Sequence, residues 1–274
     1  MPDDKSNMIG FAADELSARP LRIPLPEYRK GEWAVLAKPP NILFDAYLGA
    51  PKVRSIISAI RARLDKPEYK RLELSVPFAV NQIDFEISGG ALMAMCEDSR
   101  MKLRNALGSD AFKFSYILLC RANPEGPRET FETELPMWKP DGEKIWAVSH
   151  RRGKKASTLF EPIEKSGEWQ IWRAFTTMPR PHQIRLHAAE RGLLISGESL
   201  YANIDVPRVS IPKDKMKKKL LEAKDKSPAL WEYIGLHLYS IKCESLGISA
   251  TIPLPDKFST AIARLGFQTV PFNL

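Results

Sequence analysis

The chain has 274 residues, of which 44% are hydrophobic and 27% charged, as in an ordinary globular protein. Its net charge of +8 favours a nucleic-acid partner and says nothing about the fold. No apolar run approaches the roughly 18 residues of a membrane span, and MPDDKSNMIG lacks the apolar core of a signal peptide. We therefore expect a cytoplasmic protein without a membrane partner. Its dispersed cysteines, Cys96, Cys120 and Cys243, indicate buried thiols and no metal site.

The N-terminal half opens with residues 1–28, whose prolines predict an extended arm. A short strand, WAVLAK, follows and ends at two prolines, and apolar residues at helical spacing predict a helix over 52–65. FAVNQI and ALMAMC are typical of strands. DSRMKLRNALG predicts a helix with Asp98 as N-cap and Gly108 as its end.

The C-terminal half is richer in strands. FKFSYILLCR predicts a buried strand, and RETFETELPMWK and IWAVSH two more. STLFEPIEK and WQIWRAFTTM predict an antiparallel pair, as do LHLYSIKCE and ISATIPLP. PHQIRLHAAERG and KFSTAIARLG predict helices. Strands joined by short turns favour an α+β fold with a largely antiparallel, mixed sheet flanked by helices.

Two stretches carry the candidate chemistry. In NQIDFEISGG, Asp84 lies between apolar runs, either as a turn residue that binds backbone N–H groups or as a reactive carboxylate. In RPHQIRLHAAERGLLISGESLY, arginines cluster at a helix start, which suits either anion binding or a solvated basic face. His182 and His187 are five residues apart and do not share a helix face, so this pattern does not indicate zinc.

These segments resemble motifs of the RluA-type RNA pseudouridine synthases. RPHQIRLHAAERGLLISGESLY is similar to R-T-H-Q-I-R-x-H-x-x-x-x-G-x-x-I-x-G-D-x-x-Y, and NQIDFEISGGAL to H-R-L-D-x-x-T-S-G-L-L. AVLAKPPNILF resembles V-V-N-K-P-x-G-L, FKFSYILL resembles F-x-x-R-x-V-x-K-x-Y-x-A-L, KKASTLF resembles G-K-x-A-x-T-x-Y, and LHLYSIKCE resembles L-H-A-x-x-L. The motifs occur in family order from about residue 30 to 267.

The resemblance implies a pseudouridine synthase-like fold over residues 29–274 and an isomerase that flips a uridine of RNA out of its stack. It implies no cofactor, since the family uses an aspartate. It places Asp84 at that catalytic aspartate, Tyr116 at the tyrosine that stacks on uracil, and Arg185 as the guanidinium that keeps the acid ionised. The implied substrate-binding residues are Gln82, Arg180, His182, Gln183 and Leu236.

The sequence also departs from the family pattern. Gln82 replaces the arginine thought to fill the gap left by the flipped base, and Ile87 replaces a threonine. The lysine-rich segment 213–226, within an insert at about 203–231, is either a solvated segment or a phosphate contact, and so is HRRGKK at 150–155. We expect a monomeric enzyme acting on ribosomal or transfer RNA. The alternatives are an RNA-binding or assembly factor that has lost catalysis and a basic protein without an RNA role.

Overall fold

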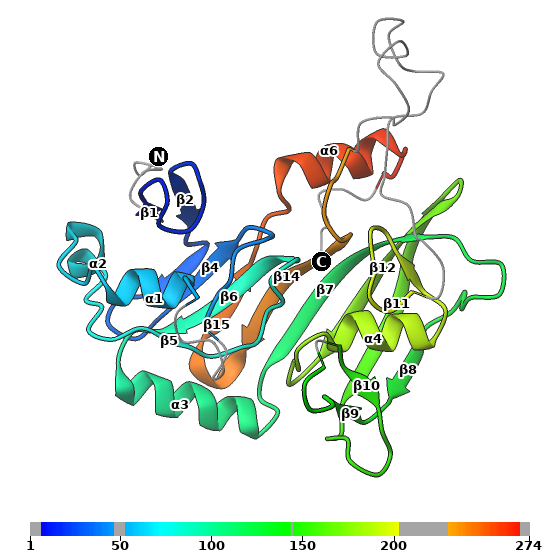
Figure 1. Ribbon diagram of the computed structural model, residues 1–274, viewed down its shortest axis with the longest axis horizontal. Helices are drawn as coiled ribbons and strands as arrows, with labels where there is room; N and C mark the ends of the chain where they lie inside the picture. Colours follow the sequence, from blue (N-terminus) through cyan, green and yellow to red (C-terminus); the bar gives the residue numbers. More distant parts are fainter. Residues whose placement is uncertain (1–6, 47–52, 144, 203–229, 269–274) are drawn as a thin grey trace, which may run out of the picture. The chain divides into compact units, whose positions relative to one another are not determined.

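A computed structural model describes residues 7–46, 53–143, 145–202 and 230–268 (Figure 1). The chain divides into two compact units. Unit 1 comprises Met1–Tyr116, Phe175–His182 and His237–Pro253, and unit 2 comprises Ile117–Ala174, Gln183–Leu236 and Leu254–Leu274. The lysine-rich segment 213–226 lies outside the described residues. None of the helices in the described part of the chain is both long and apolar enough to cross a membrane.

Unit 1 is built around strand β6 (Ser88–Ala94), which is buried along its whole length. β4 (Trp33–Lys38) pairs antiparallel with β6 from Lys38↔Gly89 to Trp33↔Ala94 and so takes one entire edge. β5 (Phe78–Ala79) and β14 (Leu236–Cys243) share the other edge at opposite ends of β6. β3 (Glu27–Arg29) extends the sheet beyond β4, and β15 (Ile248–Thr251) pairs with β14.

The β6–β14 contact is the parallel pairing of the unit, with His237 opposite Ser88 and Leu238 opposite Gly89. The two backbones approach so closely that a Cβ built on Gly89 would lie 2.4 Å from the Leu238 nitrogen, and Gly89 has a φ of 130°. Only glycine fits such a position. The glycine pair of NQIDFEISGG, Gly89 and Gly90, therefore lies within strand β6.

The N-terminal region of unit 1 is more ordered than the extended arm predicted for it. β1 (Met8–Phe11) and β2 (Leu21–Pro24) form an antiparallel pair whose apolar side chains, Ile9, Phe11 and Ile23, are buried. Burial of these side chains stabilises the strand pair, although the prolines around it predicted an arm without regular structure.

The helices of unit 1 are shorter or begin earlier than predicted. The helix expected over 52–65 is α1 (Ile56–Arg61), which starts in a Ser55–Ser58 capping box, and α2 (Pro67–Arg71) follows it. α3 (Glu97–Gly108) packs on β6 and has Cys96 as its N-cap in place of Asp98. A single-turn 3-10 helix (Glu244–Leu246) joins β14 to β15.

Unit 2 holds four neighbouring strands in the order β7-β12-β11-β8. β11 (Ser157–Ser166) and β12 (Trp169–Thr176) are the predicted pair, and β8 (Phe131–Glu134) runs antiparallel to β11. β7 (Lys113–Arg121) and β12 each extend a few residues into unit 1. β13 (Leu194–Ile195) pairs with β7, and β9 (Met137–Trp138) with β10 (Ala147–Val148).

Two helices complete the described part of unit 2. α4 (Gln183–Glu190) and α6 (Asp256–Arg264) are labelled in Figure 1. α4 packs against β13, and α6 buries Phe258 against Trp231, with ring centroids 4.7 Å apart. Antiparallel pairs dominate both units, with the parallel β6–β14 pairing among them. The predicted α+β class with a largely antiparallel, mixed sheet is confirmed.

Gly89→Ala tests the close approach of β6 to β14. We expect the free energy of unfolding to fall by about 3 kcal/mol, because a Cβ at positive φ would collide with backbone atoms that cannot move aside. Gly108→Ala is the control, since no atom lies within 4 Å of its Cβ position. Denaturant unfolding of both variants measures the difference, and equal stabilities would contradict this account of Gly89.

Candidate active site

The loop between β5 and β6 carries Asp84, and the buried side chain of Asn81 fixes the start of this loop. The amide of Asn81 donates to the Gly90 carbonyl (3.1 Å) and accepts the Leu92 N–H (2.7 Å). β5 ends before Asn81, so the Gly90 carbonyl and the Leu92 N–H bind the Asn81 side chain. Asn81 is only 1% exposed, so its own polar atoms also need these protein partners. Asp84 itself is 8% exposed.

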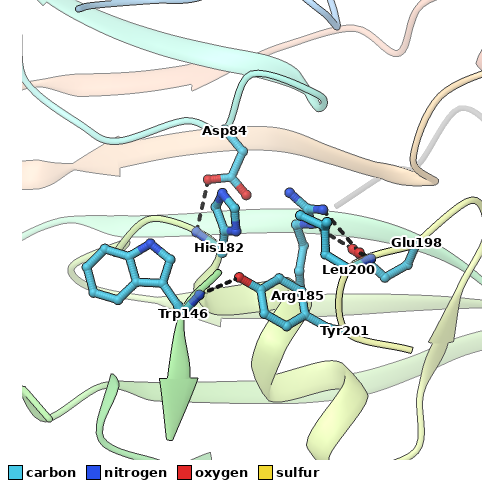
Figure 2. Close-up of polar contacts among 7 residues, drawn as sticks. All are labelled: Asp84, Trp146, His182, Arg185, Glu198, Leu200 and Tyr201. Carbon is cyan, nitrogen blue, oxygen red and sulfur yellow. Dashed lines mark hydrogen bonds and ion pairs between the residues drawn. The ribbon is translucent and has the colours of Figure 1, made fainter. Parts of the chain in front are cut away.

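Asp84 is bound by the second candidate segment. Its Oδ1 accepts the backbone N–H of His182 at 3.0 Å, although the two residues are 98 positions apart (Figure 2). His182 has a φ of 59°, which is uncommon for a non-glycine residue and is typical of functional or strained positions. An N–H donor at this distance stabilises negative charge on the carboxylate. In the same segment as this N–H donor, Arg180 and His182 are half-buried.

Lys38 holds the residues that follow Asp84. Lys38 is 1% exposed, and its ammonium group donates to four backbone carbonyls: Pro39 (3.0 Å), Ile42 (3.0 Å), Phe85 (3.2 Å) and Ile87 (2.7 Å). Burial lowers the pKa of Lys38 to about 7, whereas the charges of Asp84 and Glu86 raise it. The carbonyls favour the ammonium form, since it has three N–H groups to share among them and a neutral amine has two.

Tyr116 also lies in unit 1, in the first half of β7, and is 3% exposed. Burial raises the pKa of its hydroxyl far above the usual value, and the charge of Asp84 raises it further. Tyr116 therefore keeps its proton at any pH near neutrality. Gln82, by contrast, is exposed.

Ser88 and His237 close the far end of the Asp84 loop. The Ser88 hydroxyl is 2.8 Å from Nδ1 of His237, and Nε2 of His237 is 3.1 Å from the Ile252 carbonyl. The carbonyl can only accept, so Nε2 carries the proton and Nδ1 accepts from Ser88. Burial lowers the pKa of His237 to about 4, so the ring is neutral near pH 7.

Arg185 lies on α4 in unit 2 and forms a buried, two-pronged ion pair with Glu198. Its Nε is 2.6 Å from Oε2 and its Nη2 is 3.1 Å from Oε1 (Figure 2). Burial would raise the pKa of Glu198, but the bond to Arg185 and its charge hold that pKa below the ordinary value. The guanidinium also lies 5.5 Å from the ring centroid of Tyr201, whose hydroxyl accepts the backbone N–H of Trp146 at 3.0 Å.

The remaining predicted residues of unit 2 are buried. Gln183 donates to the Ser157 carbonyl (2.9 Å) and to the Thr158 hydroxyl (3.0 Å), and Leu236 is 1% exposed. The ring nitrogens of His187 are each 3.0 Å from an oxygen, of Thr158 and of Leu135, and burial lowers its pKa to about 4. His187 thus fastens α4 to the sheet.

The structure therefore joins Asp84 to the His182 segment and places Tyr116 in the same unit. The catalytic roles of Asp84 and Tyr116 and the pairing of Asp84 with Arg185 stay predictions. So do the substrate contacts, which were assigned to Gln82, Arg180, His182, Gln183 and Leu236. Sequence reasoning missed Glu198 as the partner of Arg185. The signal was present, because Gly197-Glu198 stands where the family signature has G-D.

Comparison with known proteins decides the family. The family model described as RNA pseudouridylate synthase matches residues 32–190, more than half of the chain. The chain belongs to this family. Enzymes of the family are isomerases that convert uridine to pseudouridine in RNA. The family region includes Lys38, Asp84, Tyr116 and Arg185.

Two relatives support the RluA type. The chain is 28% identical over 151 residues to "Dual-specificity RNA pseudouridine synthase RluA" of Haemophilus ducreyi, covering 51% of this chain and 67% of the relative. It is 27% identical over 125 residues to "Ribosomal large subunit pseudouridine synthase C" of Rickettsia bellii, covering 45% of this chain. The chain spans 42% of that second relative's length.

Two solved structures share the fold at 14% sequence identity. "Human RNA Pseudouridylate Synthase Domain Containing 4" has a TM-score of 0.61 and covers 88% of this chain and 92% of its own. "Human RNA Pseudouridylate Synthase Domain Containing 1" has a TM-score of 0.56 and covers 96% and 90%. The predicted pseudouridine synthase-like fold is confirmed.

Lys38→Met tests the clamp on the Asp84 loop. We expect the free energy of unfolding to fall by about 3 kcal/mol, since buried carbonyls lose their donor. Lys102→Met, at an exposed position of α3, should change it by less than about 0.5 kcal/mol. Denaturant unfolding provides both numbers, and a Lys38 variant as stable as the control would refute the clamp.

Acid titration tests the buried neutral histidines. The folded pKa of His237, about 4, lies below the unfolded value of 6.5, so the folded state binds this proton less readily. The stabilising contribution is complete above pH 6.5 and is lost as the pH falls toward 4, with a limiting slope of about 1.4 kcal/mol per pH unit. His237→Gln should flatten the stability curve in this window, whereas His150→Gln, at an exposed position, should not.

Proposed function

We propose that this protein isomerises a uridine of ribosomal or transfer RNA to pseudouridine with Asp84 as the reacting carboxylate. The observation that carries the proposal is the bond between Asp84 and the His182 N–H, which unites the two family motifs at one point of unit 1. We further propose that the enzyme works as a monomer in the cytoplasm.

The reaction breaks the C1′–N1 bond of the uridine and forms a C1′–C5 bond, while one hydrogen leaves C5 and one is gained at N1. Atoms and charge balance without an external reactant, which agrees with our expectation that no cofactor takes part. Asp84 acts either as the nucleophile or as the acceptor of the C5 proton. The donor from His182 suits both roles because it stabilises the ionised carboxylate.

Tyr116 and Gln82 are proposed to hold the flipped base. Tyr116 offers a flat ring and a hydroxyl that remains protonated, so it can stack on uracil and donate a hydrogen bond. Gln82 is exposed two residues before Asp84 and can bind a base edge. Gln82 is uncharged, so we expect it to bind the gap left by the flipped base more weakly than the arginine of the family motif does.

Arg185 is proposed as the guanidinium that faces Asp84 in the working enzyme. Its bidentate bond to Glu198 fixes the plane and orientation of the group, as a positioned charge requires. We assign the substrate contacts to Arg180, His182 and Gln183 and the apolar pocket wall to Leu236.

Phosphates are proposed to bind the exposed basic turn of unit 2. Arg151, Arg152, Lys154 and Lys155 are all exposed, and the Arg152 guanidinium lies 5.1 Å from the Trp138 ring centroid. Such a cluster supplies salt-dependent affinity without sequence preference.

The second candidate is an RNA-binding or assembly factor without catalysis. It is favoured by the substitution of the flipping arginine with Gln82, which weakens the element that exposes the target base. The two functions differ in whether Asp84 is required for a chemical product.

Asp84→Asn separates the two candidates. RNA from a strain that lacks this protein is incubated with the wild type or the variant, and pseudouridine is mapped by chemical adduct. We expect the variant to lose about 10³-fold or more in rate, because an amide can neither attack nor accept the proton. Asp65→Asn, at an exposed position, is the matched control.

RNA affinity decides the interpretation of that experiment. The Asp84 variant should bind RNA as the wild type does, so that its loss is one of chemistry. Identical pseudouridine maps for wild type and variant, with RNA binding intact, would exclude the enzymatic function and support the binding factor.

A further inference from the structure

The surface of unit 1 has a hollow that is lined in part by Phe85, the residue after Asp84. The hollow has a volume of about 290 Å³, and its walls are largely the apolar side chains of Leu16, Ile42, Leu43 and Val53. Asn41, Arg54 and Phe85 complete the lining. Val53 and Phe85 are 48% and 42% exposed, so the hollow presents large apolar side chains to solvent, one of them on the residue that follows Asp84.

Phe85 is held rigidly although its ring is exposed. Its carbonyl accepts from the Lys38 ammonium (3.2 Å) and from the Asn41 N–H (2.8 Å). The Phe85 carbonyl is thus tied both to Lys38 at the end of β4 and to Asn41 just beyond it. An aromatic ring on a fixed backbone has only two torsions left to order, so it binds a flat partner at small entropic cost.

Arg54 adds the only charged side chain of the lining within the described residues. It is exposed, and its guanidinium donates to the Asp14 carbonyl, which fixes where the charge lies. An aromatic face, an apolar wall and one guanidinium are the features by which proteins bind an unstacked nucleotide, since the base stacks and the phosphate pairs with the arginine.

We propose that this hollow binds a nucleotide of the RNA that flanks the target uridine, with its base on Phe85 and its phosphate toward Arg54. The inference rests on the proposed function, which brings RNA to the adjacent Asp84. That continuity favours RNA over a protein partner, because Phe85 directly follows Asp84 in the same loop. Bases beside the target then contribute to substrate choice.

The test uses Asp84→Asn protein, which cannot turn over, and a short fluorescent oligouridylate whose binding is followed by anisotropy. We expect Phe85→Ala to weaken binding about tenfold, as for loss of one stacked base. Phe85→Trp should keep affinity within about twofold, since it retains a stacking face. Met101→Ala removes another exposed apolar side chain of unit 1, 54% exposed on α3, and should change nothing.

Photo-crosslinking gives a readout that does not depend on affinity. In an oligouridylate that carries 4-thiouridine, fragmentation mass spectrometry should place the crosslink on the Phe85 side chain and not only on its peptide, which also contains Asp84. Unchanged affinity of Phe85→Ala, or no crosslink on Phe85, would overturn the proposal. A Phe85→Ala variant that loses self-association in sedimentation while binding oligouridylate normally would also overturn it, in favour of a second copy of the chain.

The proposed function and this inference fail in different ways. If wild-type protein forms no pseudouridine in the deletion-strain RNA, the proposed function fails regardless of Phe85. If pseudouridine forms and Phe85→Ala binds oligouridylate as tightly as its parent, the function stands and the flanking-base site does not.

Discussion

A single buried ammonium organises the proposed reacting loop. Lys38 stands at the end of β4, and the two prolines after it cannot donate to a neighbouring strand, so the chain must leave the sheet there. The chain then turns back and brings the Pro39 and Ile42 carbonyls to the ammonium, opposite those of Phe85 and Ile87. Two loops distant in sequence thereby share one donor, and neither can move without leaving carbonyls unpaired.

The opposite end of the same loop depends on how closely two strands approach. Gly89 allows β6 to contact β14 directly, and this pairing puts Ser88 within reach of His237. Asn81 fixes the loop where it leaves β5. Asp84 therefore projects from a short segment anchored before, within and after it. Such restraint is what a carboxylate needs to hold a reactive geometry.

Periodicity in the sequence predicted elements whose burial follows a regular pattern, such as β7, β11, β12 and α6. It missed the β1–β2 pair because prolines near these short strands resemble an irregular arm. It also placed the N-cap of α3 at Asp98, although the Cys96 side chain accepts the capping N–H. Local patterns describe one segment at a time, and these features depend on what packs against it.

Only the site residues that belong to a sequence motif could be predicted. Asp84 and the RPHQIR segment were found as motifs, but the bond between them uses the backbone of His182 in a left-handed conformation that no side chain announces. The Arg185–Glu198 pair and the clamp of Lys38 are buried charge interactions, and their partners are selected by tertiary structure. The contribution of these interactions to stability therefore cannot be predicted from composition or residue spacing.

The positions at which this chain departs from the family motif differ in burial. Ile87, at the position of the motif threonine, is 3% exposed, so this change is accommodated in the core beneath the loop. Gln82 and Phe85 are exposed on either side of Asp84. A change that faces the core alters packing, whereas changes that face solvent alter what the loop can touch. Of the two departures, the one at Gln82 is therefore expected to affect substrate choice, and the one at Ile87 to affect packing beneath the loop.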